Sequence, residues 1–379
     1  IKAIENYLVS HNDNEYLKKL IEYKKLVKFD NSYLEKLLEI SAPDEVKKHP
    51  IRFNYFTCRV PCLTENNRVL IKDKGLVSIK DCKSGDYIWT QYGYKKVLWN
   101  NSHFANDIYK VTFKNGYTIE GTGHHPVLVN KTGRSTYLKY EWAGLADLKP
   151  GEHIVLNHKP CEDYNTDIEY DFARLIGFID GDGSIATSDR VKLCYWTGES
   201  DELKEYYGNL LSHYSNSELH YDLSQEESHH AIVQAVYNTK FSTYLHSLGV
   251  RGDGVPKCIL NSSPKIWLAY LQGIWDSDGN ISLNNDNRKY PQVGIKLIKK
   301  QTVHDIGLML LMLGIPNSLL DINYYKNKPN CHEQLRCSVR DHIGYVLFKN
   351  LISDYMKSNK RLKFESLNID NNYIEYAQT

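Results

Sequence analysis

Two copies of an acidic motif are the clearest candidates for chemistry in this chain of 379 residues. Residues 171–185 (DFARLIGFIDGDGSI) match residues 267–281 (WLAYLQGIWDSDGNI), and the second aspartates of the two copies are Asp182 and Asp278. Two carboxylates held close together repel each other unless a cation lies between them, and carboxylate oxygens are preferred ligands of Mg²⁺. The pair therefore predicts a divalent metal site wherever the two motifs meet.

The residues that precede each acidic end indicate how the two motifs would meet. Each motif reads as an apolar helix with two small residues one turn apart, Gly177 and Gly181 in the first copy, Gly273 and Ser277 in the second. Small residues at this spacing let two helix backbones approach closely. If the helices pack on each other, their C-terminal ends bring the two aspartates together.

Three other interpretations of the motifs compete with a metal site. An EF-hand loop requires glycine at its sixth position and glutamate at its twelfth. Those positions hold Ile185 and Val191 in the first copy, and Ile281 and Asn287 in the second, so this class of calcium site is excluded. Turns that merely end two helices, or a helix interface without catalysis, stay open, but duplication at matched spacing favours the metal site.

The motifs LIGFIDGDG (175–183) and LQGIWDSDG (271–279) resemble the two motifs of single-chain LAGLIDADG homing endonucleases. The resemblance implies an α+β fold of two αββαββα repeats, at about 167–262 and 263–366, whose sheets lie over the major groove of DNA. It implies a double-strand cut at a long DNA site, with Mg²⁺ as the cofactor and Mn²⁺ as a substitute. It also implies the metal ligands, which are the carboxylates of Asp182 and Asp278 and the main-chain carbonyls of Gly181 and Ser277.

One departure from the family concerns a basic residue before the second motif. Asp253 stands where the resemblance places a lysine, in the segment RGDGVPK (251–257). Lys257 or Arg251 would have to substitute, and we take Lys257 as the catalytic candidate. An impaired first half is the alternative.

Basic residues are unevenly distributed along the chain. The net charge of +1 indicates nothing about nucleic acid, but residues 291–365 are richer in basic than in acidic residues, and residues 167–253 show the opposite. Lysine and arginine bind the phosphates of DNA. We expect double-stranded DNA as the partner, with these contacts: Lys296, Lys299, Lys300, Arg336, Lys360 and Arg361.

The segment before the nuclease has a different texture. Short β-branched and aromatic runs separated by turn signals predict an all-β domain at residues 62–166. The segment that begins at Cys62 (CLTENNRVLI) and the segment GTGHHPVL, which holds Thr122 and His125, resemble the first two sequence blocks of inteins. The resemblance implies the N-terminal part of a HINT protein-splicing domain. Cys62 would then be the nucleophile that attacks the carbonyl of Pro61, His125 the proton donor, and Thr122 a support for the scissile peptide.

The intein resemblance also assigns the ends of the chain. Residues 1–61 are expected to be a helical N-extein fragment of a host protein, and residues 367–379 a tail or the start of a C-terminal splicing region. The C-terminal splicing blocks have no counterpart after residue 366. Either the chain is truncated, or an intein partner supplies that half in trans. A homing nuclease of this kind is expected to cut the host gene at the empty insertion junction.

Two alternative functions remain open. One is an RNA-binding maturase of the same fold, which would have no need of the residues at Cys62, and the other is an inactive remnant of an intein. The sequence contains no apolar run long enough to span a membrane and no paired CxxC motif among its 8 cysteines. We therefore expect an intracellular location and no membrane partner.

Overall fold

The structure is a computed structural model, and it describes residues 62–131, 139–156, 160–186, 189–196, 198–222, 231–282, 292–322 and 332–365. The predictions of a helical N-extein at 1–61 and of a tail at 367–379 lie outside the described residues.

The first part of the described chain is built of strands. Its elements are β1 (Arg68–Ile71), β2 (Gly75–Ser78), β3 (Tyr87–Thr90), β4 (Gly93–Lys96), β5 (Ile108–Thr112), β6 (Thr118–Thr122), β7 (Pro126–Asn130), β8 (Tyr140–Gly144) and β9 (His153–Ile154), with 3₁₀ turns at Ile79–Asp81 and Leu145–Asp147. They form antiparallel sheets in the orders β2-β1-β3-β4, β5-β6 and β8-β7-β9. The predicted all-β character of residues 62–166 is confirmed over their described part, which we call the β-domain. Its assignment to the HINT fold stays a prediction.

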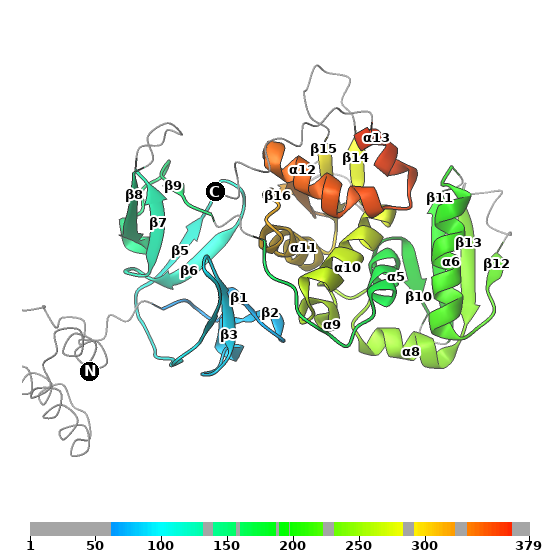
Figure 1. The fold of residues 1–379 in the computed structure, drawn as a ribbon, viewed down its shortest axis with the longest axis horizontal. Helices are drawn as coiled ribbons and strands as arrows, with labels where there is room; N and C mark the ends of the chain where they lie inside the picture. The colour runs from blue at the N-terminus through cyan, green and yellow to red at the C-terminus, as the bar shows by residue number, and fades with distance from the viewer. Residues whose placement is uncertain are drawn as a thin grey trace, which may run out of the picture.

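The second part is an α+β unit made of two repeats (Figure 1). The first repeat contains α5 (Tyr170–Asp182), β10 (Gly183–Ile185), β11 (Arg190–Trp196), α6 (Asp201–Ser215), β12 (His220–Asp222), β13 (Ala231–Tyr237) and α8 (Thr239–Ser247). The second contains α10 (Pro264–Ser277), β14 (Asn280–Ser282), β15 (Gln292–Leu297), α11 (Lys300–Met312), β16 (Asn317–Ile322), β17 (Gln334–Val339) and α12 (Asp341–Leu351). Short helices follow each repeat: α9 (Lys257–Leu260) after the first, and two 3₁₀ turns (Ser353–Tyr355, Asn359–Arg361) with α13 (Leu362–Glu365) after the second.

The sheets of the two repeats share one topology, as the duplicated motifs predict. Their strand orders are β10-β11-β13-β12 and β14-β15-β17-β16. Along β11, buried side chains such as Val191 and Leu193 alternate with partly exposed ones. This period of two packs one face of the sheet on the helices and leaves the other face to solvent.

Local sequence explains where the outer helices begin. The side-chain oxygen of Ser200 accepts a hydrogen bond from the backbone N–H of Leu203 and starts α6, and Asn238 starts α8 in the same way. Such caps satisfy N–H groups that a first helical turn leaves without partners. The apolar helices α5 and α10 lack this side-chain cap and lie in the middle of the unit, where packing holds them (Figure 1).

The hydrophobic core joins the α+β unit to part of the β-domain. Leu70, Leu76 and Tyr117 of the β-domain belong to the same buried cluster as α5, α10 and α11. A second, smaller cluster of Val127, Val129 and Leu145 fills the part of the β-domain that contains β7. The sheet of β1 and β2 is therefore packed on the α+β unit, whereas the sheet of β7 has a core of its own.

A backbone contact also joins the two parts. The N–H of Leu319, in β16, donates to the carbonyl oxygen of Asn115 at 2.7 Å. A Cβ atom added to Gly116, which has φ +88°, would overlap the backbone of Leu319, so the turn between β5 and β6 lies directly against β16. Strand β16 stands at the end of its sheet.

Among the described helices, none combines the length and the hydropathy that crossing a bilayer requires.

Candidate functional site

Helices α5 and α10 lie side by side and touch through their glycines. A Cβ at Gly177 would overlap the carbonyl oxygen of Tyr270, and a Cβ at Gly273 would overlap that of Arg174. At the C-terminal end, a Cβ at Gly181 would overlap the side chain of Ser277. The close approach predicted from the small residues is therefore found along the whole contact.

This packing brings the second aspartates of the two motifs together. Asp182 is the last residue of α5, and Asp278 is the residue that follows α10. Burial, and then the charge of Asp278, raises the pKa of Asp182 to about 6. Neighbouring protein atoms that displace water also raise the pKa of Asp278, although its side chain keeps access to solvent. A carboxylate whose ionisation is opposed by a neighbouring carboxylate, as that of Asp182 is by Asp278, marks a place where a divalent cation would be stabilised.

The donor set fits a cation that takes oxygen ligands and retains water. Within the parts of the chain that the structure describes, no three His, Cys, Asp or Glu side chains gather into a metal site. Protein ligands at this place would therefore be the two carboxylates with the carbonyls of Gly181 and Ser277. Mg²⁺ is commonly held by only one or two carboxylates, with water and substrate phosphate completing its shell.

The first aspartate of each motif is buried and has a structural role. Asp180 accepts a hydrogen bond from the backbone N–H of Arg251 and another from the Tyr270 hydroxyl at 2.9 Å. Asp276 accepts from the backbone N–H groups of Lys357 and Ser358, both at 2.8 Å. Each of these carboxylates thus fixes a loop that follows its repeat.

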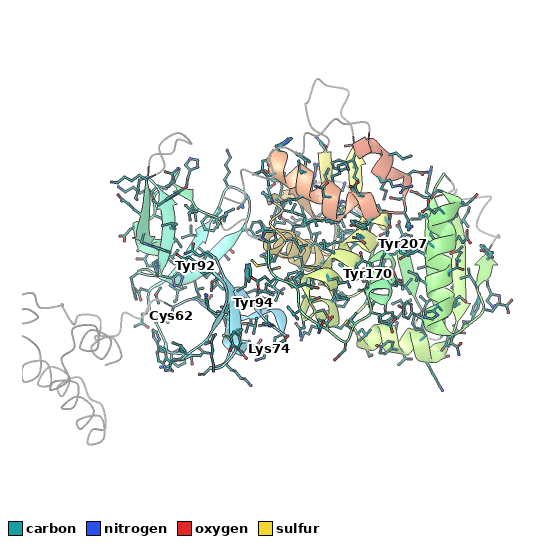
Figure 2. All side chains as sticks on the ribbon, in the orientation of Figure 1. Cys62, Lys74, Tyr92, Tyr94, Tyr170 and Tyr207 are labelled. Atoms are coloured by element: carbon teal, nitrogen blue, oxygen red, sulfur yellow. The ribbon has the colours of Figure 1, made fainter. Side chains whose placement is uncertain are left out.

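A residue of the opposite helix completes each of these buried sites. Tyr270 of α10 reaches Asp180, and Arg174 of α5 pairs with Asp276 at 3.1 Å. Tyr207 also donates to Asp276, at 2.6 Å. The Arg174 side chain is about 5% exposed, so its charge is neutralised inside the protein. Figure 2 shows Tyr207 within the α+β unit, well apart from Cys62 in the β-domain.

Each of the two loops carries a cation to the end of a motif helix. The guanidinium of Arg251 donates to the carbonyl oxygens of Asp180 at 2.7 Å and Gly181 at 2.6 Å. The amine of Lys360 donates to the carbonyl oxygens of Asp276 at 3.1 Å and Ser277. These cations lower the pKa of both Asp182 and Asp278. A carbonyl oxygen has two lone pairs, so these contacts leave room for a second partner on Gly181 and Ser277.

The structure places the basic residues that the sequence singles out near the second motif. Lys257 is exposed at the start of α9, and Arg251 instead lies against the end of α5. Asp253 points away from the carboxylate pair, since it accepts a hydrogen bond from the N–H of Gln301 at the start of α11. Lys360, predicted as a phosphate contact, lies beside the two aspartates.

The other predicted DNA contacts divide into two groups. Lys296 and Arg336 face each other on the outward side of the second sheet, in β15 and β17. Lys299, Lys300 and Arg361 are engaged within the protein. Lys299 donates to the carbonyl of Arg251 at 2.7 Å, Lys300 pairs with Asp321 and Glu333 at 2.9 Å each, and Arg361 lies 3.8 Å from Glu202.

The second set of predicted residues meets in the β-domain. The backbone N–H of Cys62 donates to the Thr122 hydroxyl at 3.0 Å, and the N–H of Thr122 donates to the carbonyl of Cys62 at 2.9 Å. His125 shares a cavity of about 770 Å³ with Cys62 and Thr122. Burial lowers the pKa of His125, and its buried Nδ1 has no hydrogen-bond partner. The structure therefore brings Cys62, Thr122 and His125 together around one cavity.

Comparisons with known proteins address the α+β unit. Residues 266–343 match the LAGLIDADG-like domain family. This LAGLIDADG-like region contains the second motif, the second sheet and the start of α12. The predicted α+β fold of this class is thereby confirmed over part of the chain.

Curated relatives match the chain at low identity. An iron-sulfur cluster assembly SufBD family protein of Mycobacterium leprae is 25% identical over 58% of this chain and 28% of its own length. The replicative DNA helicase DnaB of a Nostoc species is 25% identical over 68% of this chain and 30% of its own. The replication factor C small subunit of Methanocaldococcus jannaschii is 25% identical over 83% of this chain and 16% of its own. The chain spans less than a third of the length of each of these relatives.

Solved structures similar to the chain include homing endonucleases. I-DmoI in complex with DNA and Mn matches with a TM-score of 0.36 and 14% identity, covering 48% of this chain and 96% of that one. I-WcaI bound to its DNA recognition sequence matches with a TM-score of 0.34 and 16% identity, covering 51% and 84%.

Two residues near the candidate sites are not predicted by the sequence. Glu199, which follows β11 of the first repeat, has a buried oxygen without a hydrogen-bond partner, and its charge acts on both Asp182 and Lys360. In the β-domain, Nδ1 of His103 lies 3.7 Å from the Cys62 sulfur. Neither residue stands in a motif, so no sequence signal distinguished them from ordinary surface residues.

Proposed function

We propose that the α+β unit is a Mg²⁺-dependent endonuclease that cuts both strands of a DNA duplex. The observation that carries the proposal is the pair of carboxylates at the joined ends of two glycine-packed helices, Asp182, which is partly buried, and Asp278, which is exposed. Two cations lie beside the pair, Arg251 on the end of α5 and Lys360 on the end of α10, and both act on both carboxylates. Two such half-sites, related by duplication, suit a substrate that itself consists of two antiparallel strands.

The residues of each half-site would divide the work of phosphodiester hydrolysis. Asp182 and Asp278 would hold the cation, with the carbonyls of Gly181 and Ser277. Bound Mg²⁺ would supply Lewis acidity at the scissile phosphate. Arg251 and Lys360 already place positive charge at this point, where negative charge would grow on the phosphate oxygens during the reaction. The buried Asp180 and Asp276 would keep the two cation-bearing loops in place.

The outward faces of the two sheets would supply the DNA contacts. On the second sheet this face carries Lys296 and Arg336, with Gln292 within 3.4 Å of Arg336. A face of basic and amide side chains can bind phosphates and also read base edges. Lys299, Lys300 and Arg361, which are engaged within the protein, would contribute less.

A homing role at an insertion junction is supported by the spread of the relatives. A replicative DNA helicase, a replication factor C small subunit and an iron-sulfur cluster assembly protein share this segment, and it occupies a minor part of each. A segment that recurs inside proteins with such different names behaves as an insertion. The proposed target is therefore the host gene without the insert, at the junction itself.

The test is cleavage of a duplex that spans the empty host junction, in Mg²⁺, by the full chain. We expect cleavage by the native chain, loss in Asp278→Asn, and no loss in Asp201→Asn, a matched change at an exposed position of α6. Binding of the duplex without cleavage would contradict the nuclease and indicate an inactive remnant. Preference for structured RNA over this duplex would indicate a maturase.

A second activity is proposed for the β-domain, because Cys62, Thr122, His125 and His103 surround one cavity. The Cys62 sulfur would attack the carbonyl carbon of Pro61, which lies outside the described residues. The bond from this carbon to the Cys62 nitrogen would break as the thioester forms, and the nitrogen would take up a proton. Burial raises the pKa of Cys62 and disfavours its thiolate, so the attack needs a base. His103, whose Nδ1 lies beside the sulfur, would accept the thiol proton. A C-terminal intein partner in trans would complete splicing.

Incubation of the full chain with a small thiol tests this second activity. We expect fragments 1–61 and 62–379 by intact mass, none from Cys62→Ala, and slower release from His103→Gln. Cys258→Ala, a matched change at another partly exposed thiol, should leave the release unchanged. An unchanged mass of the native chain would rule out an active Cys62.

A further inference from the structure

The loop that carries Arg251 is held in a strained conformation. Arg251 has φ 66°, in the left-handed region that residues with a side chain rarely adopt. Such a conformation persists only where the surrounding contacts fix it. The contacts of residues 251–255 therefore decide whether the guanidinium reaches the end of α5.

Most of these contacts come from the start of α11, in the second repeat. The carbonyl of Arg251 accepts from Lys299 at 2.7 Å, and the N–H of Gly254 donates to the Thr302 hydroxyl at 2.9 Å. The N–H of Val255 donates to the carboxylate of Asp305 at 3.0 Å. Helix α11 is thus the support on which the first-half loop rests.

Asp305 also contacts the β-domain. Its second oxygen accepts from the guanidinium of Arg68, in β1, at 2.8 Å, and from the Gln301 amide at 2.6 Å. The Asp305 side chain is about 2% exposed and that of Arg68 about 27%. Burial raises the pKa of Asp305, and Arg68 is the largest influence in the opposite direction. Without Arg68, a buried carboxylate would lose its charged partner while still being needed by Val255.

Other contacts keep the β-domain fixed against the same helix. The Tyr117 hydroxyl donates to the side-chain oxygen of Asn317, and Gly307 of α11 leaves the space that this hydroxyl requires. The Arg68–Asp305 pair therefore lies in a packed interface, where a change on one side is transmitted to the other.

From these contacts we propose that Arg68 of the β-domain is a positioning residue for the first half of the nuclease. It holds Asp305, which holds the loop that places Arg251 against the carbonyl of Gly181, next to Asp182. The second half has no such dependence, because the Lys360 loop is fixed by Asp276 within the α+β unit. The inference rests on the proposed nuclease, and it adds that the β-domain supports the cut of one strand.

Strand-resolved cleavage tests the dependence. Arg251→Met and Lys360→Met first identify which labelled strand each half cuts. We then expect Arg68→Met to slow the cleavage of the strand served by Arg251 about tenfold relative to cleavage of the other strand. The reason is that Asp305 loses its charged partner, which weakens its charge-assisted hydrogen bond with the N–H of Val255. Arg68→Lys, which keeps the positive charge, should keep the ratio of the two cleavage rates close to that of the native chain. Lys131→Met, which removes a comparable ion pair with Glu152 elsewhere in the β-domain, should leave it unchanged.

Hydrogen exchange tests the same contacts without any cleavage. In the full chain, Arg68→Met should speed exchange of the peptide holding the Arg251, Gly254 and Val255 amides by about three- to tenfold. The peptide holding the Lys357 and Ser358 amides should not change. Equal slowing of both strands, or equal exchange in both loops, would overturn the inference. Failure of the native chain to cut would remove the nuclease, while the exchange result would still decide whether Arg68 controls the loop.

Discussion

The C-terminal ends of α5 and α10 each carry a cation, but different side chains hold the two cations in place. In both, a buried aspartate fixes a following loop, and the loop places a cation on the last carbonyls of the helix. The first end uses Tyr270, Asp180 and Arg251, and the second uses Arg174, Asp276 and Lys360. The geometry has been kept while the side chains have changed. Duplication therefore preserved where charge is placed, and left the two halves free to obtain that placement by different contacts.

The largest expected effect is on the rate of each strand's cut. Removing one charged donor from a catalytic centre typically lowers the rate by about 10²–10³-fold. We expect Arg251→Met and Lys360→Met each to lower the cleavage rate of one strand by this amount, measured on a duplex labelled differently on its two strands. Because each cation lies on the C-terminal carbonyls of a different helix, Arg251 on α5 and Lys360 on α10, the affected strands should differ. Loss of the same strand in both variants would break the comparison.

The next effect is on stability, and here the two halves should behave alike. Gly177 and Gly273 each face a backbone carbonyl of the opposite helix with no space for a methyl group. We expect Gly177→Ala and Gly273→Ala each to lower the free energy of unfolding by about 1–3 kcal/mol, since the helices would have to separate. Denaturant titration measures this. Ala269→Gly, at a buried position of α10, changes the size by one methyl group in the other direction and should cost about 1 kcal/mol or more through the low helix propensity of glycine, without separating the helices.

The carboxylate pair should make stability depend on pH. The pKa of Asp182 is about 6 in the folded chain and starts from 3.8. Its neutral form therefore stabilises the fold most fully below pH 3.8, and this contribution is lost as the pH rises through 6. Without metal at pH 7.5, Asp182→Asn should be more stable than the native chain by about 2 kcal/mol.

Added Mg²⁺ should reverse that order, because a cation bound only by the folded chain stabilises it. Thermal unfolding at pH 4 and 7.5, with and without Mg²⁺, measures both effects. A native chain whose midpoint at pH 7.5 is indifferent to Mg²⁺ would contradict a shared cation site. Asp201→Asn should follow the native chain throughout.

The smallest effect concerns Asp253. This carboxylate accepts a hydrogen bond from the first turn of α11 and is not beside the aspartate pair. We expect Asp253→Lys to lower the free energy of unfolding by about 1 kcal/mol, through loss of a helix cap, and to give no faster cleavage. Faster cleavage of the strand served by Arg251 in this variant would contradict this expectation and show that the first half is slowed by the absence of a lysine at position 253.

Much of the fold and part of the site follow from the sequence. The duplicated motif predicts two matching repeats, because the same spacing of apolar and small residues builds the same helix contact. Gly177 and Gly273 then predict that contact, and the contact brings Asp182 and Asp278 together. Strand segments broken by turn signals likewise predict the all-β part.

The cations could not be assigned in the same way. Lys257 and Arg251 lie in one short segment, and spacing alone gives no preference between them. The choice is made by the left-handed backbone at Arg251, which turns its side chain onto the end of α5. Lys360 is placed by the contact of Asp276 with residues 357 and 358, across a long sequence separation. His103 meets Cys62 for a similar reason, since only the folded β-domain brings them together.

The turn between β5 and β6, which lies against β16, affects what happens when the α+β unit is separated from the β-domain. A strand at the end of a sheet offers unpaired N–H and carbonyl groups, and these recruit strands of other chains when nothing covers them. Here the turn at Asn115 and Gly116 occupies part of that edge. Excising the α+β unit as a stand-alone cutting tool would uncover it, so such a fragment should self-associate unless β16 receives charged residues or a substitute cover.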